Sequence, residues 1–210
     1  MDSTKSFVHL SERSSIKVAF VGNPNSGKST LFNALTGLNQ RTGNFPGVTV
    51  DKKVGSAKIS ATTTAEFVDL PGTYSLYPKS LDERVACEVL CNPDNTDHPD
   101  VTVIIADASN LKRNLFLVSQ IIDLKIPVIL ALNMMDMLEK EGVVIDTVRL
   151  SERLGVKVIA ISARNREGLE ELKKSLLEPL QIPPYDFIDV KKIAGEAIER
   201  VKSVVTVNSD

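Results

Sequence analysis

A glycine-rich stretch near the amino terminus carries the residue types that bind phosphate. Residues 22–29 fit the pattern G-x-x-x-x-G-K-[ST]. Its glycines let the backbone approach closely, so that successive N–H groups point at negative charge. The Lys28 ammonium can reach the outer phosphates, and the Ser29 hydroxyl is a hard oxygen ligand for Mg²⁺. The residues expected at this site are Gly22, Asn23, Pro24, Asn25, Ser26, Gly27, Lys28, Ser29 and Thr30. An accidental glycine-rich turn is the alternative interpretation.

A second short motif supplies a carboxylate and a backbone donor. The sequence Asp69-Leu70-Pro71-Gly72 has the form D-x-x-G and ends a β-branched, apolar run. At the end of a strand, Asp69 is expected beside the magnesium ion and the Gly72 N–H beside the terminal phosphate. A motif this short occurs by chance in many chains, so it carries weight only together with the others.

Two further segments indicate guanine as the base. They are Asn133-Met134-Met135-Asp136 and Ser162-Ala163-Arg164. The Asp136 carboxylate can accept hydrogen bonds from both the N1–H and the exocyclic amino group of guanine. Adenine lacks this donor pair and would leave the carboxylate unpaired, at a cost on the order of 1–3 kcal/mol. In the second segment, a backbone N–H can meet guanine O6.

These motifs need a sheet that brings them together. The sequence predicts strands in residues 16–21, 49–59, 65–70, 101–106, 128–132 and 157–161, and helices in 27–35, 81–91, 111–124, 147–154 and 169–180. Short buried strands that alternate with helices predict an α/β fold: a six-stranded, mostly parallel sheet with one antiparallel strand and helices on both faces. Each motif ends a predicted strand, and the carboxyl ends of parallel strands form a ligand crevice.

The composition fits one domain and argues against several classes of protein. Of 210 residues, 42% are hydrophobic and 25% are charged, which is close to the usual composition of soluble proteins. The formal net charge is −2, and the Lys and Arg residues do not gather in a basic block of the kind that binds nucleic acids. No apolar run approaches the roughly 20 residues of a spanning helix, and the first residues lack the apolar core of a secretory signal. We expect a soluble, cytoplasmic chain with a flexible leader (1–15), a nucleotide-binding domain (16–182) and a helical tail (183–210).

The motifs and two loops resemble a known family. The four motifs are similar to those of translation-factor-related GTPases, with Met134 where Lys is common. Residues 43–50, Gly-Asn-Phe-Pro-Gly-Val-Thr-Val, and 69–76, Asp-Leu-Pro-Gly-Thr-Tyr-Ser-Leu, resemble the two switch regions of the ferrous iron transport protein B family. The resemblance covers roughly residues 16–170. It implies a P-loop G-domain fold that binds GTP and GDP with Mg²⁺ and hydrolyses GTP. It also implies a membrane iron-permease region in the same polypeptide, with this domain on the cytosolic side of the bacterial inner membrane.

The resemblance also implies roles for single residues. Thr49 is the expected switch-I threonine, which meets Mg²⁺ and the attacking water; Thr42 is a competitor with a shorter spacing from Lys28. Thr73 stands where many GTPases carry a water-orienting Gln, so slow intrinsic turnover is expected. Asn25 is expected to help hold a K⁺ ion beside the phosphates, or else only to form the turn. The expected catalytic residues are Thr49, Gly72, Asn25 and Lys28, and the expected Mg²⁺ ligands are Ser29, Thr49 and Asp69.

Three functions stay open at this point. The first is a GTP-driven switch that regulates Fe²⁺ uptake. The second is a free-standing GTPase of ribosome assembly or tRNA modification, which would need a basic appendage that the net charge of −2 does not favour. The third is a binding module timed by GDP release. Cys87 and Cys91, four residues apart, could bind iron or pack as small hydrophobes. Assembly into a homo-oligomer is also left open.

Overall fold

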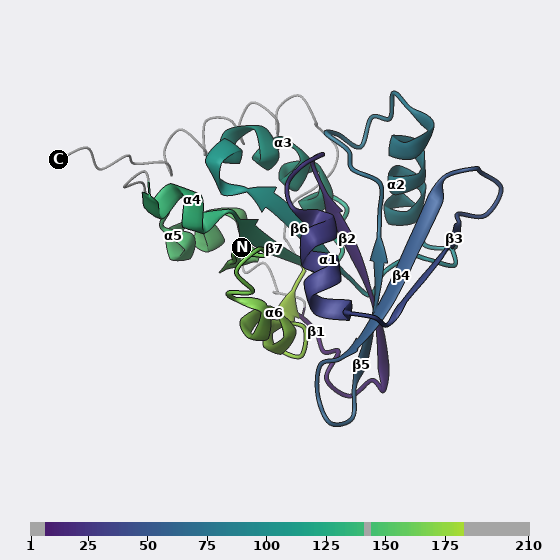
Figure 1. The fold of residues 1–210 in the computed structure, drawn as a ribbon, viewed down its shortest axis with the longest axis horizontal. Coiled ribbons are helices and arrows are strands. Elements are labelled where there is room, and N and C mark those ends of the chain that lie inside the picture. Colours follow the sequence, from purple (N-terminus) through teal and green to yellow (C-terminus); the bar gives the residue numbers. More distant parts are fainter. Residues whose placement is uncertain (1–6, 141–143, 183–210) are drawn as a thin grey trace, which may run out of the picture.

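A computed structural model describes residues 7–140 and 144–182, and its elements are arranged around one large sheet (Figure 1). The strands are β1 (Phe7–Val8), β2 (Ser15–Gly22), β3 (Gln40–Asn44), β4 (Asp51–Lys58), β5 (Thr64–Asp69), β6 (Val101–Asp107), β7 (Val128–Asn133), β8 (Lys157–Ala160) and β9 (Leu180–Gln181). The helices are α1 (Lys28–Thr36), α2 (Leu81–Cys91), α3 (Leu111–Ile122), α4 (Met135–Lys140), α5 (Thr147–Leu154) and α6 (Leu169–Ser175), with a 3₁₀ turn, η1 (Ala108–Asn110). The helical tail predicted for 183–210 lies outside the described residues.

The sheet confirms the α/β prediction but has one more strand than expected. Its order is β3-β4-β5-β2-β6-β7-β8, and β4 alone runs against the others, because it pairs antiparallel with both β3 and β5. The prediction of six strands was wrong because residues 40–44 were expected to be a loop. Their sequence, Gln-Arg-Thr-Gly-Asn, is polar and without alternation, yet an edge strand needs only backbone pairing with its neighbour.

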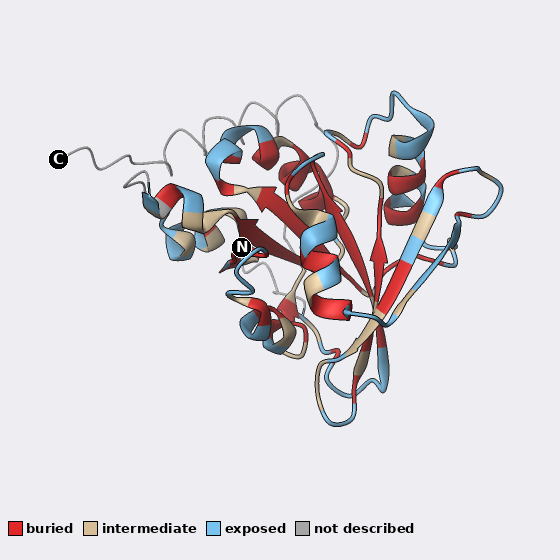
Figure 2. Ribbon diagram, viewed as in Figure 1, coloured by how far each residue is buried: buried red, intermediate tan, exposed pale blue. Residues whose placement is uncertain are grey.

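The core lies in two layers, one on each face of the sheet (Figure 2). Side chains of α1 and α6 pack on one face, and those of α2, α3, α4 and α5 pack on the other. Strand β2 shows the alternation: Val18 and Phe20 belong to the first layer, whereas Ala19 and Val21 belong to the second. Burial on both sides explains why the central strands read as continuous apolar runs.

Local capping explains which helix ends could be predicted. Helix α2 begins after Ser80, whose side chain accepts a hydrogen bond from the Glu83 N–H, and α5 begins after Asp146 in the same way. Helix α5 ends at Gly155, which has a φ of 67°. Both helices have their predicted bounds. Helix α6 ends at Ser175 rather than near residue 180, and the six-residue α4 was not predicted.

Part of the expected leader is ordered against the domain. Phe7 and Val8 pair antiparallel with Gln181 and Leu180, and Leu10 is buried in the layer that holds α1 and α6. Within the predicted leader, residues 7–10 thus contribute a short strand and a core side chain, at a place where three apolar side chains lie within four positions. A short apolar cluster can be buried without long-range periodicity in the sequence, which is why pattern reading missed it.

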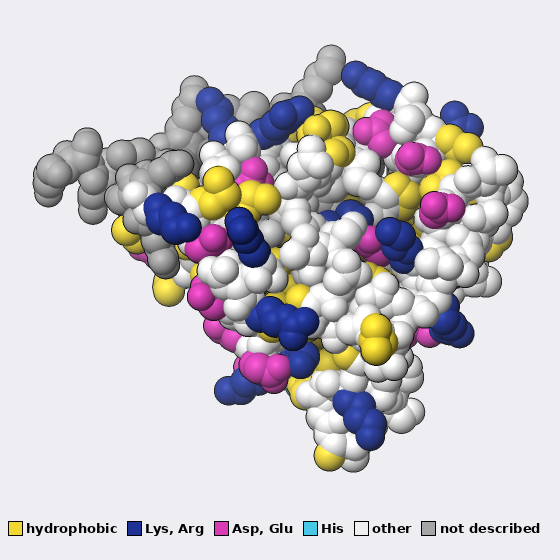
Figure 3. All heavy atoms as spheres, viewed as in Figure 1, with side chains coloured by type: hydrophobic (Ala, Val, Ile, Leu, Met, Phe, Trp, Pro, Cys, Tyr) yellow, Lys and Arg dark blue, Asp and Glu magenta, His cyan; other side chains and the backbone are white. Residues whose placement is uncertain are grey.

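The lengths of the helices and the charges on the surface bear on membranes and nucleic acids as partners. Within the described ranges, no helix is both long enough and apolar enough to cross a membrane. On the face shown in Figure 3, cationic and anionic side chains are interspersed with neutral and hydrophobic ones. The expectation that this chain binds no nucleic acid stays a prediction.

Candidate functional site

The phosphate-loop residues connect β2 to α1 in a conformation that requires glycine. Asn25 and Gly27 have φ values of 66° and 89°, so the backbone turns through the left-handed region twice before α1 begins at Lys28. A Cβ on Gly22 would lie 2.3 Å from the Ile105 carbonyl oxygen, and one on Gly27 would lie 2.1 Å from Asn133 Nδ2. The loop therefore packs against β6 and against the first residue of the predicted base motif.

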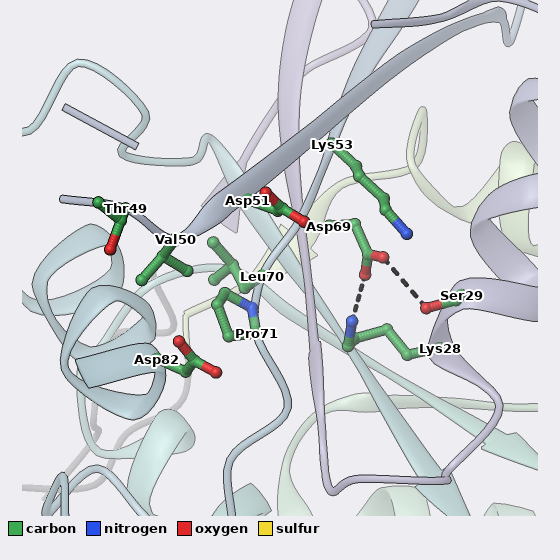
Figure 4. Close-up of a pocket in the computed structure, with 10 residues that line it drawn as sticks. All are labelled: Lys28, Ser29, Thr49, Val50, Asp51, Lys53, Asp69, Leu70, Pro71 and Asp82. Atoms are coloured by element: carbon green, nitrogen blue, oxygen red, sulfur yellow. Dashed lines mark hydrogen bonds and ion pairs between the residues drawn. The ribbon is translucent and has the colours of Figure 1, made fainter. Parts of the chain in front are cut away.

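At the phosphate end, three predicted residues contact one another (Figure 4). The Lys28 ammonium forms an ion pair with Asp69 Oδ1, and Ser29 Oγ donates to Asp69 Oδ2 at 3.2 Å. The Lys28 and Asp69 side chains are only 11% and 5% exposed, so each neutralises the other in a poorly solvated place. A buried charge is tolerated when it is paired, and this pair holds the ends of β5 and the phosphate loop together.

The expected switch-I threonine lies on the wall of the same cavity. A cavity of about 410 Å³ is lined by Lys28, Ser29, Thr49, Val50, Asp51, Lys53, Asp69, Leu70, Pro71 and Asp82. Thr49 is exposed, and Figure 4 shows its side chain apart from Lys28 and Ser29. Its neighbours Phe45 and Val50 are buried, and the Phe45 N–H donates to the Val50 carbonyl at 3.0 Å. The competitor Thr42 lies on β3 and does not line this cavity.

The predicted second switch segment, residues 69–76, contacts the phosphate loop. A Cβ on Gly72 would lie 3.2 Å from the backbone of Pro24, and the Thr73 N–H donates to the Gly22 carbonyl at 3.1 Å. Thr73 is buried, and its hydroxyl donates to the Ser75 carbonyl at 2.7 Å. The residue that replaces the usual glutamine therefore bonds within its own loop.

The base motifs form one hydrogen-bonded unit with the phosphate loop. Asn133 Nδ2 donates to the Ser26 carbonyl at 2.9 Å, and Asn133 Oδ1 accepts from the Ala163 N–H at 3.0 Å; both bonds are buried. Ser162 Oγ donates to Asp136 Oδ1 at 2.9 Å, which orients the carboxylate. One asparagine side chain thus joins three loops that lie far apart in the sequence.

These residues line a second cavity, of about 540 Å³. Its lining residues are Gly27, Thr30, Asn133, Met134, Asp136, Met137, Lys140, Ser162, Ala163 and Arg164. Both cavities reach the volume of small-molecule sites, and the consecutive residues 27–30 contribute to both linings, Lys28 and Ser29 to the first and Gly27 and Thr30 to the second. A ligand with a planar head in one cavity and an anionic tail in the other would pass over the first turn of α1.

Several residues that were predicted to belong to the site line neither cavity. Asn25 is exposed at the turn, and it lines neither cavity. Asn23 and Ser26 are buried, and their side-chain polar atoms have no hydrogen-bond partner among the described residues. Met135 also lies outside both linings.

Sequence reading missed four polar residues that line the cavities: Asp51, Lys53, Asp82 and Lys140. A usable signal exists for two of them. Thr49, Asp51 and Lys53 alternate along one chain segment, so they share one side of an extended strand. Once Thr49 is expected in the site, its partners at i+2 and i+4 follow.

The two cysteines lie side by side on α2, away from these cavities. Their sulfur atoms are 3.6 Å apart, and Cys87 Sγ donates to the Leu76 carbonyl at 3.4 Å. Both are free thiols, and Cys91 is exposed, which contradicts its expected packing as a buried hydrophobe. Although the residue as a whole is exposed, its sulfur is partly buried, and this partial burial together with the adjacent Cys87 thiol raises the pKa of Cys91 to about 12. Among the described residues, no group of three or more potential metal ligands forms.

Comparison with known proteins agrees with the geometry. The family model of ferrous iron transport protein B matches residues 16–176. The Fe(2+) transporter FeoB of Salmonella typhimurium (strain LT2) is 47% identical over 167 residues, which cover 77% of this chain and 21% of the relative. The solved cytosolic domain of L. pneumophila FeoB is 43% identical with a TM-score of 0.75, covering 82% of this chain and 68% of that one.

A second solved structure bears on the nucleotide. It is the cytosolic domain of the T. maritima FeoB iron transporter in GMPPNP form, which is 42% identical with a TM-score of 0.72 and covers 77% of this chain and 62% of that one. This chain spans about a fifth of the length of the curated relatives that it matches. From the matched residues and the shared fold, the chain belongs to the ferrous iron transport protein B family.

Proposed function

We propose that this chain binds guanine nucleotides, with the base in the cavity beside Asp136 and the phosphates in the cavity beside Lys28. The observation that carries this proposal is the bonding of Asn133 to Ser26 and Ala163, which holds the base motifs against the phosphate loop. The GMPPNP form of the T. maritima relative supports it, because GMPPNP is an analogue of GTP.

Guanine is favoured over adenine by the fixed carboxylate of Asp136. The Ser162 hydroxyl occupies one side of Oδ1, and the remaining acceptor capacity faces the cavity that both residues line. Guanine offers two adjacent donors there, whereas adenine offers none in that arrangement. Met134, with its φ of 67°, supplies an apolar wall rather than the usual lysine charge.

A magnesium ion fits the donor set at the phosphate end. The Ser29 hydroxyl and Asp69 carboxylate are hard oxygen donors 3.2 Å apart, and Thr49 lines the same cavity. These three residues would hold Mg²⁺, which neutralises phosphate charge when bound. Because Lys28 is paired with Asp69 in this structure, it must exchange that carboxylate for phosphate oxygens when nucleotide enters.

We further propose that the chain hydrolyses GTP slowly. Lys28 and the Gly72 N–H would stabilise the charge that develops on the terminal phosphate, and Thr49 would hold the attacking water. Thr73 cannot replace the missing glutamine, because its hydroxyl already bonds to Ser75. Asn25, which is exposed at the phosphate loop, would help to hold K⁺ as an additional positive charge.

In the intact protein, we propose that GTP binding and hydrolysis regulate Fe²⁺ movement through a membrane region of the same polypeptide. The matched relatives are named Fe(2+) transporters, and this chain corresponds to about a fifth of their length. The structure of the L. pneumophila relative is of a cytosolic domain, which supports placing this domain on the cytosolic side of a bacterial inner membrane. The family match favours this function over a free-standing GTPase of ribosome assembly.

The test is nucleotide binding and hydrolysis by the purified chain. GDP should bind with measurable affinity by calorimetry and ADP should not. GTP hydrolysis should run several-fold faster in K⁺ than in Na⁺ at equal ionic strength. Asn25→Ala should abolish the K⁺ effect, whereas Asn165→Ala, a change at an exposed residue outside both cavities, should retain it. Equal affinity for GDP and ADP would refute the guanine assignment, and equal rates in both salts would remove Asn25 from catalysis.

A further inference from the structure

One cation in the phosphate-end cavity has no part in the function described above. Lys53 lies on β4 directly opposite Asp69 of β5, and it lines the cavity together with Lys28 and Ser29. Figure 4 shows its ammonium directed toward the Asp69 carboxylate, on the side away from Lys28. A lysine at the start of α1 and a lysine on β4 therefore lie on either side of one carboxylate.

Lys28 and Lys52 have ion-pair partners, whereas Lys53 has none among residues 7–140 and 144–182. Lys28 is paired with Asp69, and Lys52 is bonded to Asp97. No carboxylate lies within ion-pair distance of Lys53 in the portion of the chain that the structure describes. Lys53 is exposed and lines the cavity, so its ammonium group is available to an anionic ligand there.

The charge of the cavity creates a need for such a group. Its lining contains three carboxylates, those of Asp51, Asp69 and Asp82, and only two ammonium groups. A terminal phosphate would enter against that negative charge, and like charges repel one another. Besides Lys28, which follows the phosphate loop directly, Lys53 is the other cation in this lining.

Lys53 approaches the cavity from another element than the phosphate loop does. Lys28 and Ser29 line this cavity from the first turn of α1, next to Gly27 and Thr30, which line the other cavity. Lys53 reaches the cavity from β4, on the far side of Asp69 from Lys28 (Figure 4). We propose that Lys53 binds the terminal phosphate of GTP and so makes strand β4 sensitive to whether GTP or GDP is bound. This inference rests on the proposed guanine-nucleotide function.

Binding of phosphate by Lys53 would also affect the edge of the sheet. Lys53 is opposite Thr42 on the edge strand β3, and β4 continues directly from the segment that carries Thr49. A phosphate contact at Lys53 would therefore fix the β3–β4 hairpin in the GTP state. In the GDP state, Lys53 would have no terminal phosphate to bind, and the β3–β4 hairpin would no longer be held by that contact.

The experiment compares the affinities of Lys53→Met for GMPPNP and GDP, both with Mg²⁺, with those of the unchanged chain. Lys58→Met serves as the matched control, because Lys58 is an exposed lysine on the same strand and lines neither cavity. We expect Lys53→Met to lower GMPPNP affinity about tenfold, the effect of one partly solvated charged contact, and to leave GDP affinity within about twofold. Lys58→Met should leave both affinities unchanged.

The outcomes separate this inference from the proposed function. An unchanged GMPPNP affinity in Lys53→Met would overturn the terminal-phosphate contact while leaving guanine binding intact. An equal loss for GMPPNP and GDP would also overturn it, because the lysine would then act on the site as a whole. If the unchanged chain bound neither nucleotide, the proposed function itself would fail.

Discussion

The two ends of the site are built from different interactions. At the base end, neutral hydrogen bonds from the Asn133 side chain join three loops, and a serine hydroxyl orients Asp136. At the phosphate end, the residues predicted to bind ligand are bonded to one another through the Lys28–Asp69 ion pair. The expected threonine, Thr49, lies apart from them on the cavity wall.

This difference shows which end is ready for its ligand. At the base end, Asn133 and Asp136 are already held by bonds that do not use the acceptors proposed for guanine. The phosphate end must break a poorly solvated ion pair and draw in Thr49 before its expected contacts form. A switch requires such an arrangement, since a ligand shifts an equilibrium only by binding its two states differently.

The largest expected effect is at Lys28. Lys28→Ala should lower GDP and GTP affinity by about 4 kcal/mol, roughly a thousandfold, because two charge-assisted bonds to phosphate are lost. Calorimetry measures this loss. The double variant Lys28→Ala/Asp69→Asn controls for the unpaired Asp69 carboxylate. A loss below tenfold would show that the phosphate end contributes less than the base end.

Next in size is a change of base specificity at Asp136. Asp136→Asn should lower GDP affinity by about 3 kcal/mol, since the amide cannot accept from both guanine donors. It should raise the affinity for xanthosine diphosphate, whose carbonyl can accept from the new amide group. Competition binding with the two nucleotides measures both changes. If both affinities fell equally, Asp136 would have only a structural role.

Asn133 tests whether the base end is assembled without ligand. Asn133→Ala should lower the free energy of unfolding of the nucleotide-free chain by about 2 kcal/mol, because two buried bonds are lost and the Ala163 N–H is left unsatisfied. Urea denaturation measures this loss, with Asn165→Ala as the exposed control. No loss would mean that the bonds form only around a nucleotide.

The smallest expected effect concerns the attachment of β4. Lys52 Nζ lies 2.5 and 2.6 Å from the two Asp97 carboxylate oxygens, and it lies over the Phe45 ring at 5.7 Å. Lys52→Met should lower the free energy of unfolding by about 1 kcal/mol, because the pair is only partly exposed.

A double-mutant cycle with Asp97→Asn isolates the contribution of this pair. GDP affinity should remain unchanged, because neither residue lines a cavity. A large fall in GDP affinity would show that the Lys52–Asp97 pair supports the site from outside both cavities.

Much of the site was predictable from local sequence. Glycine and asparagine at 22–27 were predicted to form a loop that approaches phosphate, and the φ values of Asn25 and Gly27 agree with that requirement. The motifs at Asp69, Asn133 and Ser162 follow strands β5, β7 and β8 as predicted, because buried parallel strands have a strong apolar signal. The roles of Thr49 and Asn25 stay predictions until they are tested.

Other features were set only by tertiary contacts. Strand β3 exists because β4 offers it a hydrogen-bonding edge, and β1 exists because β9 lies beside it. The sequence alone predicted the motif residues that are proposed to bind a guanine nucleotide, since that prediction depends on side-chain type and strand order. It did not determine that Lys28 pairs with Asp69, that Asn133 bridges Ser26 to Ala163, or that Lys53 enters the cavity. Those facts depend on distances between segments tens of residues apart, which only packing of the whole sheet can define.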